Sequence, residues 1–186
     1  DIMVEQYKTS HTYLECDADS LYEHLIPATL ARDFPCMADV ESSLLYFCKL
    51  VSKNHKVALT GECADEIFGG YPWFYRSEML YRDFFPWLHD PHARVGLFDD
   101  SVVHAARGFE FMREAYRQSL ADCPVLDGEP ESDRVARHAT WLSTRYFMAN
   151  LLERKDRMSM YHGLEVRVPF CDYRIAEYLY GVPWEY

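Results

Sequence analysis

The sequence lacks several features that would place it in a membrane, on a nucleic acid or outside the cell. No apolar run in residues 1–186 approaches the about 20 residues needed to span a bilayer, and we expect no signal peptide. Acidic residues outnumber basic ones by 30 to 19, giving a net charge of −11. This argues against a nucleic-acid partner, whose phosphates require a basic stripe. We therefore expect neither a membrane nor a nucleic acid as partner.

The cysteines lack the spacing of a disulfide framework or a zinc site. Six are scattered along the chain with no CxxC pair, at positions 16, 36, 48, 63, 123 and 171. In a domain of 186 residues this pattern is typical of reduced thiols in the cytoplasm. Cytoplasmic localisation is the resulting prediction.

Few strands and many helices are predicted. The best strand candidates are the apolar Val57–Leu59 and the pair Tyr13 and Leu14, with two or three strands in all against six or seven helices. Helices are expected over residues 20–32, 39–51, 105–121, 132–162 and 173–180, with short helices over 71–104. Asp172 is expected to cap the last of these. These elements make an α/β chain that is predominantly helical. Because two or three strands cannot support a doubly wound sheet, we expect an incomplete domain.

Three of these helices carry specific expectations. Leu21, Leu25 and Leu30 are the core candidates of the first, which Pro27 should kink or split. In the other two, we expect Asp39 to cap the helix over 39–51 and Ser132 to cap the longest. The predicted core face of the helix over 39–51 consists of Val40, Leu44, Phe47 and Cys48.

Three carboxylates, Glu62, Asp65 and Glu66, follow the predicted strand at 57–59 and open a helix that Gly69 and Gly70 should end. A tight turn from a strand into a helix is where α/β folds place ligands. Carboxylates in a first helical turn are also favoured by the helix dipole. Both interpretations stay open: a well-capped helix, or a metal and nucleotide site with Glu62 and Asp65 facing one cleft.

A second cluster of charges follows the longest predicted helix. Gly163, Glu165, Arg167 and Pro169 come in close succession, after Arg154, Lys155 and Arg157. A buried Glu–Arg lattice would hold a turn, whereas guanidinium groups would clamp carboxylates or phosphates. We predict that Glu165 and Arg167 are mainly structural and pin the turn against the core.

Taken together, these segments resemble the synthetase domain of glutamine-dependent asparagine synthetases. Residues 60–71, TGECADEIFGGY, are similar to that family's SGEG(A/S)DELFGGY. Residues 156–172, DRMSMYHGLEVRVPFCD, are similar to its DRMSMAHGLEVRVPFLD. The segment ADVESSL at 38–44 also fits. Thr60 replaces the usual serine and Cys63 the usual glycine.

The resemblance implies an adenine-nucleotide α-hydrolase-like fold of the ATP-pyrophosphatase type. It also implies an enzyme of asparagine biosynthesis, a carbon–nitrogen ligase that activates aspartate with ATP and Mg²⁺ as β-aspartyl-AMP and releases pyrophosphate. Ammonia from a glutaminase domain would then displace AMP. By position, Thr60 and Gly61 would lie against the adenylate, Glu62 would serve in forming it, and Asp65 would bind Mg²⁺.

Parts of the family pattern are absent from residues 1–186. The pyrophosphate loop SGGxDS, the lysine of the C-terminal RxKxxF segment and the glutaminase domain have no counterpart here. The expectation is one incomplete synthetase domain, inactive by itself, whose parent enzyme could be a homodimer. The alternatives are a β-lactam synthetase-like or other amidotransferase-linked ligase and a non-catalytic helical binding module. A related tRNA-modifying enzyme is disfavoured by the acidity.

Overall fold

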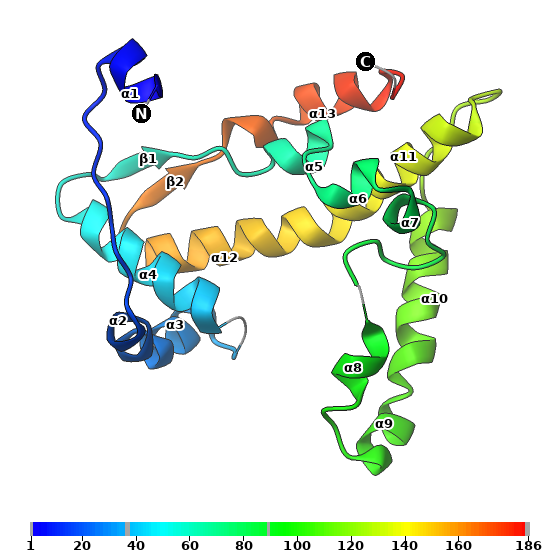
Figure 1. Ribbon diagram of the computed structural model, residues 1–186, viewed down its shortest axis with the longest axis horizontal. Helices are drawn as coiled ribbons and strands as arrows, with labels where there is room; N and C mark the ends of the chain where they lie inside the picture. The colour runs from blue at the N-terminus through cyan, green and yellow to red at the C-terminus, as the bar shows by residue number, and fades with distance from the viewer. Residues whose placement is uncertain (1, 36–37, 89, 185–186) are drawn as a thin grey trace. The chain divides into compact units, whose positions relative to one another are not determined.

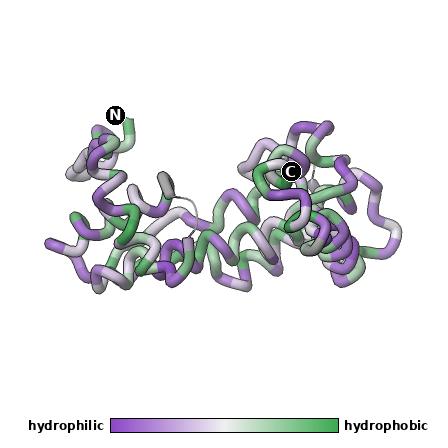
Figure 2. The backbone as a smooth tube through the Cα atoms, turned by 90° about the horizontal axis from the view of Figure 1, so that it is seen from below, coloured by the Kyte–Doolittle hydropathy of each residue, from purple (hydrophilic) through white to green (hydrophobic). Residues whose placement is uncertain are grey.

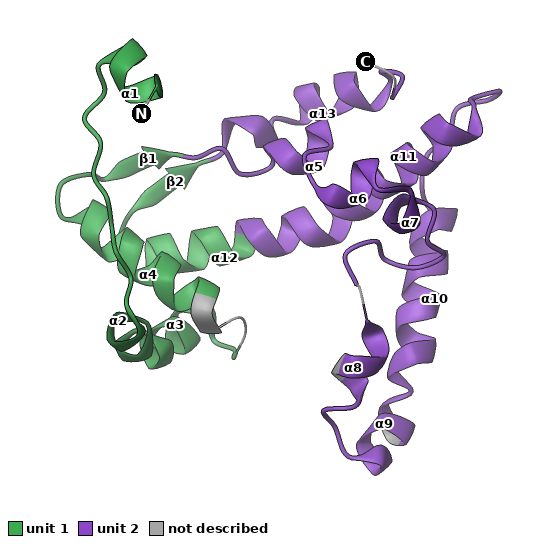
Figure 3. Ribbon diagram, in the orientation of Figure 1, with its two compact units in different colours: residues 1–59, 153–167 green, residues 60–152, 168–186 purple. Residues whose placement is uncertain are grey.

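The computed structural model describes residues 2–35, 38–88 and 90–184, and only the backbone of residues 38, 39, 94 and 105. It divides into two compact units, each built from two separate stretches of chain (Figure 3). Unit 1 contains residues 1–59 and 153–167, and unit 2 contains residues 60–152 and 168–186.

The described residues are predominantly helical, with one small sheet (Figure 1). In unit 1 the elements are α1 (Ile2–Tyr7), α2 (Ala18–Glu23), α3 (Leu25–Arg32), α4 (Ala38–Ser52), β1 (Val57–Leu59), most of α12 (Ala149–Met160) and β2 (Glu165–Arg167). In unit 2 they are α5 (Ala64–Phe68), α6 (Pro72–Tyr75), α7 (Ser77–Leu80), α8 (Pro91–Val95), α9 (Asp100–Ala106), α10 (Gly108–Ala121), α11 (Glu131–Leu142), the π-helix η1 (Ser143–Met148), the 3-10 helix η2 (Pro169–Cys171) and α13 (Tyr173–Tyr180).

The core of unit 1 lies where α3, α4 and α12 meet. Ala28, Ala31, Leu45 and Met158 form its buried cluster. The first predicted helix is indeed split, but at His24, between α2 and α3. Pro27 instead sits in the first turn of α3, where a missing N–H is tolerated. The prediction for Leu30 is wrong, because this side chain is 63% exposed.

Further sequence predictions for unit 1 are wrong. Residues 9–17, which include Tyr13 and Leu14, form neither a strand nor a helix. Asp39 lies inside α4, which begins at Ala38, so Asp39 does not precede the helix as a cap. On the same helix Cys48 is buried as predicted, whereas Phe47 is exposed. Leu45 rather than Phe47 fills the core, so the buried face is rotated from the predicted one.

The sheet of unit 1 consists of β1 and β2, which run parallel with Val57 opposite Glu165 and Leu59 opposite Arg167. Successive side chains of a strand point to opposite faces, so Glu165 and Arg167 share one face. Nε of Arg167 donates to Oε1 of Glu165 over 2.8 Å, and the two side chains are 62% and 56% exposed. The expected buried Glu–Arg lattice is therefore wrong for this pair.

This exposure changes the expected effect of replacing Arg167. We predict that Arg167→Ala lowers the free energy of unfolding by less than about 1 kcal/mol, because exposed ion pairs contribute little. Urea denaturation of the variant beside the wild type measures this. A loss of several kcal/mol would mean that Arg167 is a buried structural tie after all.

Aromatic side chains dominate the core of unit 2. One cluster joins Trp73, Phe74 and Met79 from α6 and α7 to Ala139 of α11. A second joins Phe85, Tyr116 and Leu142. The short helices expected over residues 71–104 are present as α6 to α9. The Pro-broken aromatic stretch thus folds onto α10 and α11 as a set of short helices and turns.

The predicted helix over 132–162 is a run of three consecutive helical elements. It begins at Glu131 with Pro130 at the N-cap position, so the predicted cap at Ser132 is wrong. Between α11 and α12 the backbone is a π-helix over Ser143–Met148. The run ends before Gly163, whose φ of +65° is easily adopted by glycine. Asp172 caps α13 as predicted, by accepting from the N–H of Arg174.

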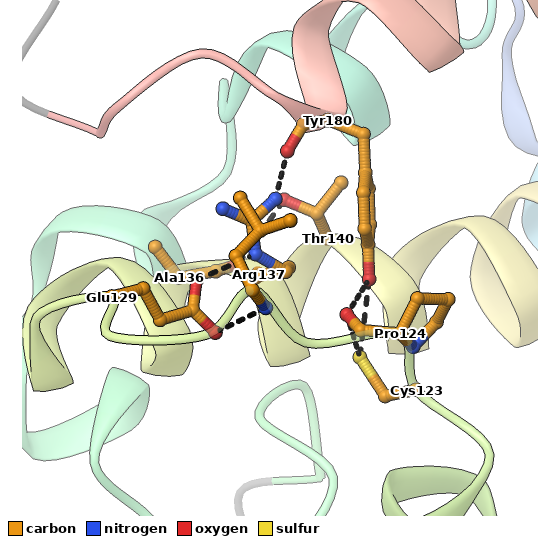
Figure 4. Close-up of polar contacts among 8 residues, drawn as sticks. Cys123, Pro124, Glu129, Ala136, Arg137, Thr140 and Tyr180 are labelled. Carbon is orange, nitrogen blue, oxygen red and sulfur yellow. Dashed lines mark hydrogen bonds and ion pairs between the residues drawn. The ribbon is translucent and has the colours of Figure 1, made fainter.

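Arg137 of α11 links the segment before α11 to the C-terminal end of α13 through a buried ion pair and a hydrogen bond (Figure 4). Arg137, only 7% exposed, donates from Nε to Glu129 over 2.9 Å and from Nη1 to the carbonyl of Tyr180. Its guanidinium also lies 4.8 Å from the centre of the Tyr180 ring. The Tyr180 hydroxyl in turn donates to the carbonyl of Pro124 over 2.9 Å. This network fixes the C-terminal end of α13 within unit 2.

Hydrophobic and hydrophilic residues alternate along the backbone in short stretches (Figure 2). Within the described residues, every helix is either too short or too polar to cross a membrane.

Candidate functional site

The site predicted from sequence lies in unit 2, in the turn that leads into α5. The N–H of Ala64 donates to the carbonyl of Gly61 over 3.3 Å, which closes the turn through Glu62 and Cys63. Cys63 has a φ of +77°, a left-handed conformation that glycine adopts far more readily. The family segment usually has glycine here. The cysteine therefore keeps a backbone geometry suited to glycine and adds a side chain that is 2% exposed.

The three carboxylates of this segment lie in different environments. Asp65, in the first turn of α5, is exposed, and Glu62, in the preceding turn, is half-buried. Glu66 is 1% exposed and accepts a hydrogen bond from the Tyr71 hydroxyl over 2.7 Å. Burial first of all, and then the charges of Asp65 and Glu62, raise the pKa of Glu66, although the Tyr71 hydrogen bond opposes them. Glu66 is thus a structural group, while Asp65 remains open to solvent.

The two glycines that end α5 are held in tight surroundings. Gly69 adopts a φ of +73°, and a Cβ built on it would overlap the ring of Trp184. A Cβ on Gly70 would overlap Oδ1 of Asp65, whose backbone carbonyl accepts from the Gly70 N–H over 2.9 Å. The carboxylate of Asp65 therefore lies over the backbone of Gly70. The sequence predicted both glycines only as the end of the helix, and the contact of Gly70 with Asp65 could not be read from it.

A largely apolar cavity of about 450 Å³ opens in unit 2 beside the other end of α5. Ile67 of α5 contributes to its wall together with Phe170, Cys171, Tyr173 and Ala176. Further lining residues come from α11 and η1. The cavity was not predicted, because its wall joins segments that are far apart in the sequence.

Carboxylates for a metal are present, but a complete cage of side chains is not. Within residues 2–35, 38–88 and 90–184, no group of three or more His, Cys, Asp or Glu is arranged to hold a metal ion. Magnesium commonly binds through one or two carboxylates and takes its remaining ligands from water and substrate phosphates. The donors Glu62 and Asp65 suit that mode of binding. Whether they face one cleft stays a prediction.

The chain is similar to known proteins along its whole length. The sequence profile of the family described as asparagine synthase matches residues 1–186. The glutamine-hydrolysing asparagine synthetase 3 of Bacillus subtilis (strain 168) is 45% identical over 98% of this chain and 30% of its own length. Glutamine-hydrolysing asparagine synthetase 2 of the same organism is 26% identical over 74% of this chain and 18% of its own length.

A vertebrate relative gives a weaker match of the same kind. The glutamine-hydrolysing asparagine synthetase of Gallus gallus is 26% identical over 47% of this chain and 18% of its own length. The chain thus spans less than a third of the curated relatives it matches. The predicted fold class, a predominantly helical α/β chain of the ATP-pyrophosphatase type, agrees with both the family match and the structure. The family profile matches the whole length of the chain, and the carboxylate segment forms the turn and helix predicted from its sequence. The chain belongs to the asparagine synthase family.

Proposed function

We propose that this chain is the part of a glutamine-hydrolysing asparagine synthetase that takes part in activating aspartate. In this reaction a carboxylate oxygen of the aspartate side chain attacks the α-phosphorus of ATP, and pyrophosphate leaves. Ammonia from a glutaminase domain of the parent chain then attacks the β-aspartyl-adenylate, giving asparagine and AMP. The observation that carries the proposal is the match to the asparagine synthase family over residues 1–186.

Four residues are proposed to act at this site. Thr60 and Gly61 lie next to each other ahead of the turn and would place their backbone against the adenylate. Glu62, half-buried in the turn, would serve in forming the adenylate. Asp65, exposed in the first turn of α5, would hold Mg²⁺. Buried Glu66 is excluded from this set, because its carboxylate is already engaged by Tyr71.

Magnesium would supply positive charge where pyrophosphate leaves. The hard carboxylate oxygen of Asp65 suits Mg²⁺, and its exposure leaves room for water and phosphate oxygens as the other ligands. The residues of this chain would then position the charged groups of ATP and aspartate. Positioning and charge stabilisation account for much of the catalysis of phosphoryl and nucleotidyl transfer.

Pyrophosphate release from the full-length protein tests the proposal. With ATP and Mg²⁺, release should depend on L-aspartate, and asparagine should form when glutamine or an ammonium salt is added. D-aspartate and L-glutamate serve as matched carboxylate controls. Release that ignores aspartate but responds to another carboxylate would assign the protein to a different ligase, such as one of the β-lactam synthetase type.

The assembly and location of the enzyme belong to the same proposal. The free thiols of the described cysteines are consistent with a reducing compartment, and we propose the cytoplasm. A homodimer is the proposed assembly. Light scattering on the full-length protein distinguishes it from a monomer.

A further inference from the structure

Two cysteines that are distant in the sequence meet beside the carboxylate segment. Cys63 precedes α5, and Cys171 is the last residue of η2, separated from α13 only by its N-cap Asp172. Burial first, and then the charge and the side-chain hydrogen bonding of Cys171, raise the pKa of the Cys63 thiol to about 12, which places the two side chains near each other. Both residues are free thiols. The usual family residues at these two positions, as quoted above, are glycine and leucine. The thiol pair is thus a departure from the family pattern at two positions that contact each other.

Neighbouring contacts within unit 2 hold the two cysteine-bearing segments together. The rings of Phe68 on α5 and Phe170 on η2 meet edge to face, with centres 6.0 Å apart. Helix α13, which follows Cys171, also packs against α5. The two thiols are therefore brought together by packing on either side of them, which raises their effective concentration for one another.

The two thiols differ in their access to solvent. Cys63 is 2% exposed, whereas Cys171 is half-buried and lines the 450 Å³ cavity. A small oxidant can therefore reach Cys171 first, while Cys63 lies behind it. Access to solvent and a neighbouring cysteine that can resolve a sulfenic acid are two features of redox-sensing cysteines. Because burial raises the pKa of the Cys63 thiol, Cys63 suits the part of the resolving thiol and not that of the thiol attacked first.

We propose that Cys63 and Cys171 form a reversible disulfide when the protein meets a peroxide, which makes this pair a redox-sensitive modification site. The sulfur of Cys171 attacks one peroxide oxygen, the O–O bond breaks, and a sulfenic acid and water result. The sulfur of Cys63 then attacks the sulfur of Cys171, and the hydroxyl leaves as water with the thiol proton. Two thiols lose two electrons in total, and hydrogen peroxide is reduced to two waters. A dithiol reductant restores both thiols.

The disulfide would tie the turn that presents Glu62 to the segment before α13. Cys63 lies between Glu62 and Asp65 in the sequence, so a covalent bond at its sulfur restrains the backbone that places both carboxylates. We expect oxidation to lower aspartate-dependent pyrophosphate release several-fold, an expectation that rests on the proposed function. Dithiothreitol should restore that release.

Peptide mapping of the full-length protein tests the disulfide without reference to activity. After peroxide treatment and alkylation under denaturing conditions, a peptide linking Cys63 to Cys171 should appear, lighter than its two halves by two hydrogens, and reductant should remove it. Cys63→Gly, which suits the left-handed backbone, and Cys171→Ser should each abolish it. Cys123→Ser and Cys48→Ser, which remove buried cysteines elsewhere, should leave it unchanged. Oxidation of Cys171 without the linked peptide would overturn the proposal.

Activity measurements separate this inference from the proposed function. If the reduced protein releases no pyrophosphate with aspartate, the proposed function fails and the mapping result stands. If the linked peptide forms while the release rate stays constant, the coupling between disulfide and site is wrong. In the Cys171→Ser variant, the release rate should be insensitive to an oxidant dose that inhibits the wild type.

Discussion

Replacing Arg137 by alanine is expected to lower the free energy of unfolding by about 3–5 kcal/mol, because it leaves a buried carboxylate without its partner. The side chains of Arg137 and Glu129 are each only 6% exposed. The variant also removes the hydrogen bond to the carbonyl of Tyr180 and the cation–π contact with its ring. Urea denaturation followed by tryptophan fluorescence measures the loss.

Arg145 provides the matched control for this substitution. It pairs with Asp122 over 3.6 Å, but the two side chains are 46% and 41% exposed. Arg145→Ala should therefore change the free energy of unfolding by less than about 1 kcal/mol. The double variant Glu129→Leu with Arg137→Met should recover much of the loss, since it removes both charges together. Equal effects of the two alanine variants would contradict the assignment of a buried pair.

The same pair predicts a dependence of stability on pH. Burial alone would raise the pKa of Glu129, but the hydrogen bond and charge of Arg137 hold this pKa below its ordinary value. A carboxyl group whose pKa is lower in the folded state stabilises the protein above its unfolded pKa, about 4.3. That contribution is lost as the pH falls through the folded pKa. Glu129→Gln should remove this part of the acid sensitivity in urea melts repeated from neutral to acidic pH.

Asp65→Asn and Glu62→Gln are each expected to lower aspartate-dependent pyrophosphate release by the full-length protein about 10²–10³-fold. This is the usual effect of removing one group that stabilises charge in a transition state. Each substitution keeps the size and shape of the side chain but removes its charge. Because Asp65 is exposed and Glu62 half-buried, melting temperatures should change little. Initial rates with saturating ATP, Mg²⁺ and aspartate measure the effect.

Glu78 is the control for these substitutions. It is an exposed carboxylate in the first turn of α7, another short helix of unit 2. Glu78→Gln should retain the wild-type rate. If Asp65→Asn also retained it at every Mg²⁺ concentration, Asp65 would not be a metal ligand. A rate restored by raised Mg²⁺ would instead support that role.

Local sequence signals predicted several of the observed elements, including the end of the helix that carries Asp65. The apolar residues of β1, the terminating Gly69 and the cap at Asp172 each act over a few residues, and all three are present in the structure. The distinction among the carboxylates could not be predicted in this way. Glu66 is buried because Tyr71 folds back onto it after the double glycine, a consequence of tertiary packing.

Long-range pairing explains the other differences between sequence prediction and structure. Glu165 and Arg167 were expected in a buried turn, but pairing with β1 makes them a strand with both charges on an exposed face. The predicted burial of Leu30 is wrong for a related reason. The helix breaks at His24, so the face of α3 that packs on α4 and α12 carries Ala28 and Ala31 instead. In both places the deciding partner lies elsewhere in the chain.

The close approach of Asp65 to Gly70 links the evolution of two positions. Any residue other than glycine at position 70 would bring a Cβ into the space that the Asp65 carboxylate occupies. A side chain at position 70 would therefore push the Asp65 carboxylate out of the place that it occupies. Selection that keeps this carboxylate in place should also favour glycine at 70, so homologues with aspartate at 65 should carry glycine at 70 more often than those without it.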